Sequence, residues 1–99
     1  MAAVTVAELL VGVELADRRR RKPRERYVAK VIATIPSEPY DSDVARAHAR
    51  LLVHARTSGR PRGAHDLIIA ATALARGRTI ITADAPGFDD LPGVVVKAA

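Results

Sequence analysis

The stretch that most constrains the fold is residues 63–74, which are apolar from Leu67 onward apart from Thr72. A helix that is apolar on every side is a buried helix, so this stretch predicts a helix inside the core. Asp66 stands at its start, after a loop that contains two glycines and a proline. A carboxylate in the first turn of a helix meets free N–H groups and the positive end of the helix dipole, which favours its ionised form. Asp66 can therefore serve as a capping acid or as a ligand of a hard cation.

Composition sets the kind of core and excludes several classes of protein. The chain has 99 residues and no cysteine, which suits one domain with a modest core and excludes disulfides and thiolate metal sites. Apolar residues make up 48% of the chain but aromatic residues only 3%, which favours helices packed on a small parallel sheet. Since no apolar run is long enough to span a bilayer and no signal peptide is recognisable, we expect a cytoplasmic protein without a membrane partner.

The charge pattern points to a polyanionic partner. The formal net charge is +5, and much of the excess lies in residues 18–22, followed by Arg24 and Arg26. Such a run can contact the phosphates of a nucleic acid, form a solvated loop between helices, or meet an acidic protein.

The first half of the chain predicts two helices. Residues 4–5 resemble the end of a strand that leads directly into a helix reaching about Asp17. Thr5 and Glu8 have the spacing of a capping box, in which the hydroxyl and the carboxylate each accept a hydrogen bond from a free N–H. Pro23 stands where a second helix can begin, and the prolines within residues 35–40 forbid a helix there.

The second half predicts two helices followed by two short strands. Asp41, or the serine after it, can cap a helix that continues to about Thr57. The buried helix ends at Gly77, and short β runs follow at residues 78–82 and 94–97. Helices between short apolar strands predict a layered α/β domain with parallel strands.

Three carboxylates occupy positions that a parallel sheet can bring together. Glu8 and Asp66 are expected in the first turns of their helices, and Asp84 follows the carboxyl end of a strand. Strand carboxyl ends and helix amino ends share one edge of such a sheet, where ligands bind. Clustered carboxylates suit Mg²⁺ or Mn²⁺, which can activate a water against a phosphodiester.

Each of these acids also has a structural interpretation, which the residues alone leave open. Glu8 is explained as a capping-box residue, Asp66 as a first-turn acid, and Asp84 as a turn former. The neighbouring acids Asp89 and Asp90 are interpreted as loop residues.

Three motifs in this order resemble the PIN-domain family, and within it the VapC-type ribonuclease toxins. They are residues 5–9, residues 63–74, and residues 82–84 with Phe88 and residues 91–93 behind them. The resemblance covers essentially the whole chain. It implies one PIN-like domain over residues 1–99, a three-layer α/β/α fold with a short parallel sheet.

The resemblance also implies an activity and its residues. Glu8, Asp66 and Asp84 fall on acidic positions that bind divalent metal in the family and would be the catalytic set, with Mg²⁺ or Mn²⁺ as cofactor. Thr82 falls on a small hydroxyl position near the metal, and Thr5 is expected to support the site. Family members typically cleave RNA, often a tRNA or a ribosomal RNA, are held inactive by a cognate VapB-like antitoxin, and commonly form homodimers.

Two departures from the family pattern set an alternative beside this function. The family begins with a strand that ends in an Asp, so we expect a partial domain that lacks the usual first strand and first acid. Gly87 also stands where many relatives carry another acid. The alternatives are therefore a metal-dependent endoribonuclease toxin and a truncated, inactive relative that binds an antitoxin or RNA. For RNA contact we expect the arginines near Asp66 and those of the basic run, namely Arg60, Arg62, Arg20 and Arg21.

Overall fold

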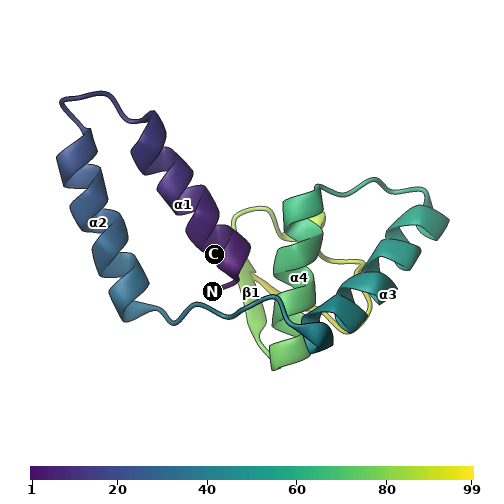
Figure 1. Ribbon diagram of the computed structural model, residues 1–99. Coiled ribbons are helices and arrows are strands. Elements are labelled where there is room, and N and C mark those ends of the chain that lie inside the picture. Colours follow the sequence, from purple (N-terminus) through teal and green to yellow (C-terminus); the bar gives the residue numbers. More distant parts are fainter. The chain divides into compact units, whose positions relative to one another are not determined.

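The computed structural model describes all 99 residues, Met1–Ala99. The chain forms two compact units, Met1–Pro39 and Tyr40–Ala99. The helices are α1 (Ala3–Leu15), α2 (Arg21–Thr34), α3 (Ser42–Ser58) and α4 (Ala64–Arg76), and the strands are β1 (Thr79–Thr82) and β2 (Val95–Ala98) (Figure 1). A short 3₁₀ turn, η1 (Ala85–Gly87), follows β1. None of the four helices combines the length and the apolar character needed to cross a membrane.

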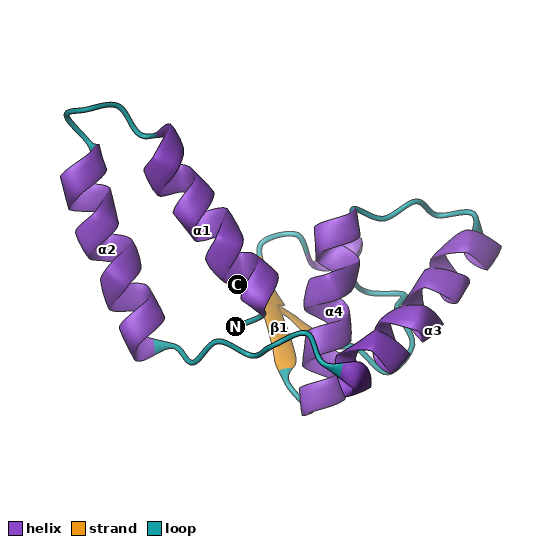
Figure 2. Cartoon of the chain, in the orientation of Figure 1, coloured by secondary structure: helices purple, strands orange, loops and turns teal.

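The first unit is a helical hairpin. Helices α1 and α2 run side by side in opposite directions and are joined by a short loop (Figures 1 and 2). Val13 of α1 and Val28 of α2 are their buried side chains, 5% and 3% exposed. At the end of the hairpin the guanidinium of Arg21 lies 3.2 Å from Glu14 and 3.3 Å from Glu25, which links the two helices by charge.

The start of α1 differs from the sequence prediction. The helix begins at Ala3, and its N-cap residue Ala2 makes no side-chain capping bond, so the predicted capping box of Thr5 and Glu8 is wrong. The structure supplies the capping from elsewhere. The backbone N–H of Ala3 donates to the carbonyl oxygen of Glu38 at 3.0 Å, and Ala2 pairs with Glu38 in an isolated parallel bridge. Because a distant segment satisfies this amide, neither a strand nor a capping hydroxyl is needed there.

The core of the second unit forms where α3 packs against α4. Val44, Ala47 and Leu51 line the inner face of α3 and are at most 1% exposed. Ala70 and Ala71 of α4 are fully buried, and their small side chains allow the neighbouring elements to approach the helix closely. The predicted buried helix is therefore confirmed.

A tight reversal joins α4 to the sheet. Gly77 ends α4 in the left-handed conformation at φ 64°, as predicted from the sequence. The N–H of Arg78 donates to the carbonyl of Ala73 at 2.8 Å. Strand β1 then returns along α4 and pairs in parallel with β2, with Ile80 opposite Val96. The two predicted strands and their parallel pairing are confirmed.

Asp41 caps α3 and also joins it to α4. Its Oδ1 accepts a hydrogen bond from the N–H of Val44 at 3.0 Å, and its Oδ2 lies 2.5 Å from the guanidinium of Arg76. The bond from Val44, followed by the interaction with Arg76, lowers the pKa of the Asp41 carboxyl below its ordinary value. This confirms the predicted cap.

We expect Asp41→Ala to lower the melting temperature by about 4 °C at pH 7, because both the cap and the ion pair are lost. A carboxyl whose pKa is lowered in the folded state stabilises fully above its unfolded pKa, about 3.9, and loses that effect as the pH falls through its folded pKa. The difference in melting temperature between parent and variant should therefore shrink below about pH 4. Calorimetry at several pH values measures this difference.

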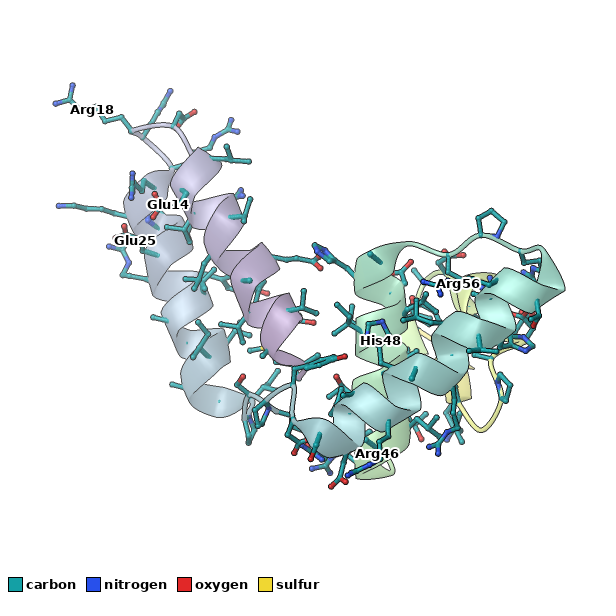
Figure 3. The ribbon with its side chains drawn as sticks, turned by 45° about the vertical axis from the view of Figure 1, so that its right-hand side comes forward. Glu14, Arg18, Glu25, Arg46, His48 and Arg56 are labelled. Carbon is teal, nitrogen blue, oxygen red and sulfur yellow. The ribbon has the colours of Figure 1, made fainter.

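Asp43→Ala is the matched control. Asp43 also lies at the start of α3, but it pairs only with the exposed Arg46, at 3.0 Å. Arg46 is labelled on α3 in Figure 3. Its loss should shift the melting temperature little, since exposed pairs of this kind contribute little. Equal shifts in the two variants would contradict the role given to Asp41.

Candidate functional site

Two of the predicted site acids lie at the same edge of the second unit. Asp66 lies in the first turn of α4, and Asp84 lies two residues beyond β1. The ten residue steps from Asp66 to Arg76 span about 15 Å of helix, and the five steps from Thr79 to Asp84 span about 17 Å of extended chain. Because α4 and β1 contact each other and run in opposite directions, these lengths bring the helix start and the strand end to one edge.

The Asp66 carboxylate is available for a ligand. The N-cap position of α4 is Gly63, which has no side chain to cap the helix, and α4 has no side-chain capping bond. Asp66 is exposed, and the Cβ that Gly63 lacks would stand 3.4 Å from Asp66 Oδ2. Of the two roles open to this acid, direct capping is therefore not observed.

Local hydrogen bonds fix the turn that carries Asp84. The N–H of Asp84 donates to Thr82 Oγ1 at 3.0 Å, and the carbonyl oxygen of Asp84 accepts from the N–H of Gly87 at 3.1 Å. The Asp84 carboxylate occupies space that a side chain at residue 87 would need, since a Cβ there would lie 2.7 Å from Oδ2. The glycine therefore allows the observed position of the acid. Thr82 supports that acid through the backbone of the turn.

The third predicted acid, Glu8, lies on α1 in the other compact unit. It is exposed, and its approach to Asp66 and Asp84 stays a prediction. No group of three or more acidic or histidine side chains gathers as a metal site in the structure. Two carboxylates at one edge nevertheless suit Mg²⁺, which keeps several waters and binds through one or two protein carboxylates together with substrate phosphates.

A cluster of charged side chains joins the loop before α4 to the segment after η1. Its centre is an ion pair between Arg62, whose side chain is only 7% exposed, and Asp90. Arg60 lies 3.3 Å from Asp90 and 3.8 Å from Asp89. His54 Nε2 lies 3.5 Å from Asp90. The cluster thus ties the loop that leads to Asp66 to the segment that follows Asp84.

This charged cluster bears on two of the predicted RNA contacts. Arg62 is turned inward onto Asp90, whereas half of the Arg60 side chain is exposed and its guanidinium also donates to the carbonyl of Pro86 at 3.4 Å. A structural role of Arg62 was missed because the sequence separates it from Asp90 by 27 residues. The only signal in the sequence is the matched number of arginines and aspartates in these two segments. RNA contact by Arg62 stays a prediction.

We expect Asp90→Ala to destabilise the protein by about 2 kcal/mol, since it leaves the buried Arg62 guanidinium without its counter-charge. The value is set below that of a fully buried pair because the Asp90 side chain is 27% exposed. Urea unfolding followed by circular dichroism measures it. The neighbouring Asp89→Ala is the control and should change the free energy of unfolding by less than about 0.5 kcal/mol, because Asp89 is exposed. Similar losses for the two variants would contradict the central place of Asp90.

Comparison with known proteins gives relatives across the chain. VapC ribonuclease Y4jK of Sinorhizobium fredii is 37% identical over 93 residues, which cover 90% of this chain and 66% of the relative. Ribonuclease VapC5 of Mycobacterium tuberculosis is 40% identical over 81 residues, 82% of this chain and 60% of the relative. The chain thus spans slightly less than two thirds of the length of these curated relatives.

Solved structures share the fold. VapBC-5 of Mycobacterium tuberculosis superposes with a TM-score of 0.81 at 37% identity, covering 98% of this chain and 77% of the other. DNA-bound VapBC from Salmonella typhimurium gives a TM-score of 0.90 at 24% identity, covering 98% and 72%. The predicted α/β class with a short parallel sheet is therefore confirmed. The model of the PIN domain family matches residues 1–94, and with these relatives it shows that the chain belongs to the PIN-domain family.

Proposed function

We propose that this chain is a divalent-metal-dependent endoribonuclease, the toxin of a type II toxin–antitoxin pair. The observation that carries the proposal is the 37% and 40% identity to two proteins named VapC ribonucleases, over most of this chain. The position of Asp66 and Asp84 at one edge, with an exposed carboxylate on each, supports it. The substrate class is RNA, in the cytoplasm.

In this proposal Asp66, Asp84 and Glu8 hold Mg²⁺ or Mn²⁺ and form the catalytic set. The bound ion would supply an activated water and stabilise the charge that develops on the phosphodiester. Asp66 contributes an exposed carboxylate at the helix start that no capping bond occupies. Thr82 orients Asp84 by accepting a hydrogen bond from its N–H, which makes Thr82 a positioning residue. Thr5, in the first turn of α1, is assigned a supporting role beside Glu8.

The proposal assigns different duties to the predicted RNA-binding arginines. Arg20 and Arg60, whose side chains are 76% and 51% exposed, would meet phosphates more readily, although Arg60 also pairs with Asp90. Arg62, only 7% exposed on Asp90, and Arg21, paired with two glutamates, would contribute less to RNA binding.

The proposed protein partners are a VapB-like antitoxin and a second copy of this chain. Solved structures that share the fold are complexes named VapBC and FitAB, which supports the antitoxin. Exposed apolar side chains of the second unit, among them Ile81 at 71% and Val53 at 59%, offer surface for such contacts.

A second candidate function is binding without cleavage. The observation that favours it is that residue 87, where the family resemblance implies another acid, is a glycine. In that case the chain would bind an antitoxin or RNA through its helices and basic residues, and Asp66 would have no catalytic duty. Purification with a small acidic partner, together with no RNA cleavage at high Mn²⁺, would support this function.

We expect Asp66→Asn to lower the rate of RNA cleavage about a hundredfold or more, because it removes a charged oxygen ligand while keeping the shape of the side chain. EDTA should abolish cleavage by the parent, and Mn²⁺ should restore it. The measurement is cleavage of labelled total tRNA and ribosomal RNA on denaturing gels. Asp89→Asn makes the same change in charge at an exposed loop acid and should leave the rate within about twofold.

Circular dichroism should show the same folded state in both variants, since the Asp66 side chain makes no capping bond that the substitution would break. Cleavage that survives Asp66→Asn, or that survives EDTA, would overturn the metal-dependent mechanism.

A further inference from the structure

The free end of the α1–α2 hairpin carries a cavity of about 650 Å³. Its lining residues are Asp17, Arg19, Arg20, Pro23, Arg24 and Tyr27. All six belong to the unit Met1–Pro39, so the hairpin alone forms this cavity. Its size is typical of sites that hold a small ligand or one unit of a polymer.

The excess charge of the whole chain is concentrated around this cavity. Residues 17–27 contain seven basic and two acidic residues, a formal charge of +5 that equals the net charge of the whole chain. The remaining residues hold nine basic and nine acidic residues and balance. We therefore expect the hairpin end to attract an anion more strongly than any other part of the chain.

The structure separates the arginines that hold the hairpin together from those that line the cavity. Arg21 lies between Glu14 and Glu25, whose positions on the two helices are visible in Figure 3, and it is not part of the cavity lining. Arg19 and Arg24 line the cavity and have no acidic side chain within 4.0 Å. Their guanidinium groups remain available to an anion.

Asp17, the one acidic residue that lines the cavity, stabilises the loop between the helices. Asp17 Oδ1 accepts hydrogen bonds from the backbone N–H groups of Arg19 at 3.1 Å and Arg20 at 2.9 Å. Its Oδ2 is 4.0 Å from the guanidinium of Arg20. These contacts offset its charge and hold the arginine backbone in place. Arg24 packs against α1 at Gly12, where a Cβ would lie 3.6 Å from its Nη1 and 3.9 Å from its Cδ.

Tyr27 gives the cavity an aromatic wall. The residue is 65% exposed, although it is one of only three aromatic residues in the chain. An exposed ring beside guanidinium groups is the combination that binds single-stranded nucleic acid, since the ring stacks on a base while the cations pair with phosphates. An acidic peptide would use the arginines and leave the exposed ring without a function.

We propose that this cavity binds one nucleotide of single-stranded RNA, with phosphate oxygens on Arg19, Arg20 and Arg24 and the base stacked on Tyr27. This inference rests on the proposed function only because it takes RNA as the substrate class. The nucleotide site is separate from the carboxylates of Asp66 and Asp84. A single strand is required, because the base of a duplex is already stacked and paired and cannot reach the ring.

The test is the binding of a fluorescein-labelled 12-nucleotide oligouridylate to the full chain, measured by fluorescence anisotropy in EDTA at several salt concentrations. Arg24→Gln should weaken binding about fivefold and make the slope of log affinity against log salt shallower by about 0.7, the value for one phosphate contact on a single strand. Arg26→Gln removes the same charge from an exposed residue outside the cavity and should weaken binding by about twofold at most.

The aromatic wall is tested separately from the charge. Tyr27→Leu should weaken binding about fivefold with an unchanged salt slope, since stacking involves no counterion release. Tyr27→Phe keeps the ring and should bind within about twofold of the parent. Both changes are at an exposed position, and melting by circular dichroism checks that the hairpin remains folded.

Three results would overturn this site: equal losses for Arg24→Gln and Arg26→Gln, parent-like binding by Tyr27→Leu, or competition by polyglutamate as strong as by unlabelled oligouridylate. The last result would assign the cavity to an acidic protein. Binding in EDTA without any cleavage in Mn²⁺ would contradict the nuclease function and leave the nucleotide site intact.

Discussion

Burial of α4 is the constraint on which the second unit depends. A helix with fully buried Ala70 and Ala71 can carry a charged group only at its ends, because a charge in its middle would lose its hydration without a partner. Asp66 therefore stands where the helix leaves the core. Gly77 ends α4 in a left-handed turn, and β1 returns to the same edge and delivers Asp84 there. The packing that buries α4 thus also determines where the two carboxylates lie.

Charge pairing then holds that edge in place. Neither loop at the edge has the regular hydrogen bonds of a helix or strand, so side chains must fix their positions. Arg62 and Asp90 do this from a largely buried position, with Arg60 and His54 around them. If Asp66 and Asp84 bind one cation, as proposed, the loops that carry them need to be held together, and such support is a common requirement of metal sites. Asp90 therefore matters to this edge through its pairing with Arg62.

The sequence predicted the elements whose causes are local. Gly77 and the cap at Asp41 act within a few residues of themselves, and the apolar run of α4 needs no partner to be recognised. The prediction of a capping box at Thr5 and Glu8 was wrong because Ala3 finds its acceptor at Glu38, far along the chain. Long-range partners of this kind leave no mark in a local pattern. Whether Glu8 approaches the other two acids, as predicted, likewise depends on contacts that no local pattern contains.

Local sequence is equally limited for the arginines. The number of arginines in a segment says little about where the electrostatic field of the protein is strong. Arg62 is neutralised by Asp90, and Arg21 by two glutamates, so both lose most of their attraction for a polyanion. Arg19 and Arg24, in the same run as Arg21, keep theirs. Within one basic run, the helix geometry thus gives Arg21 a structural role and turns Arg19 and Arg24 toward the cavity. In the proposed function, RNA would be attracted first to the end of the hairpin, because residues 17–27 carry the excess positive charge and the remaining residues balance.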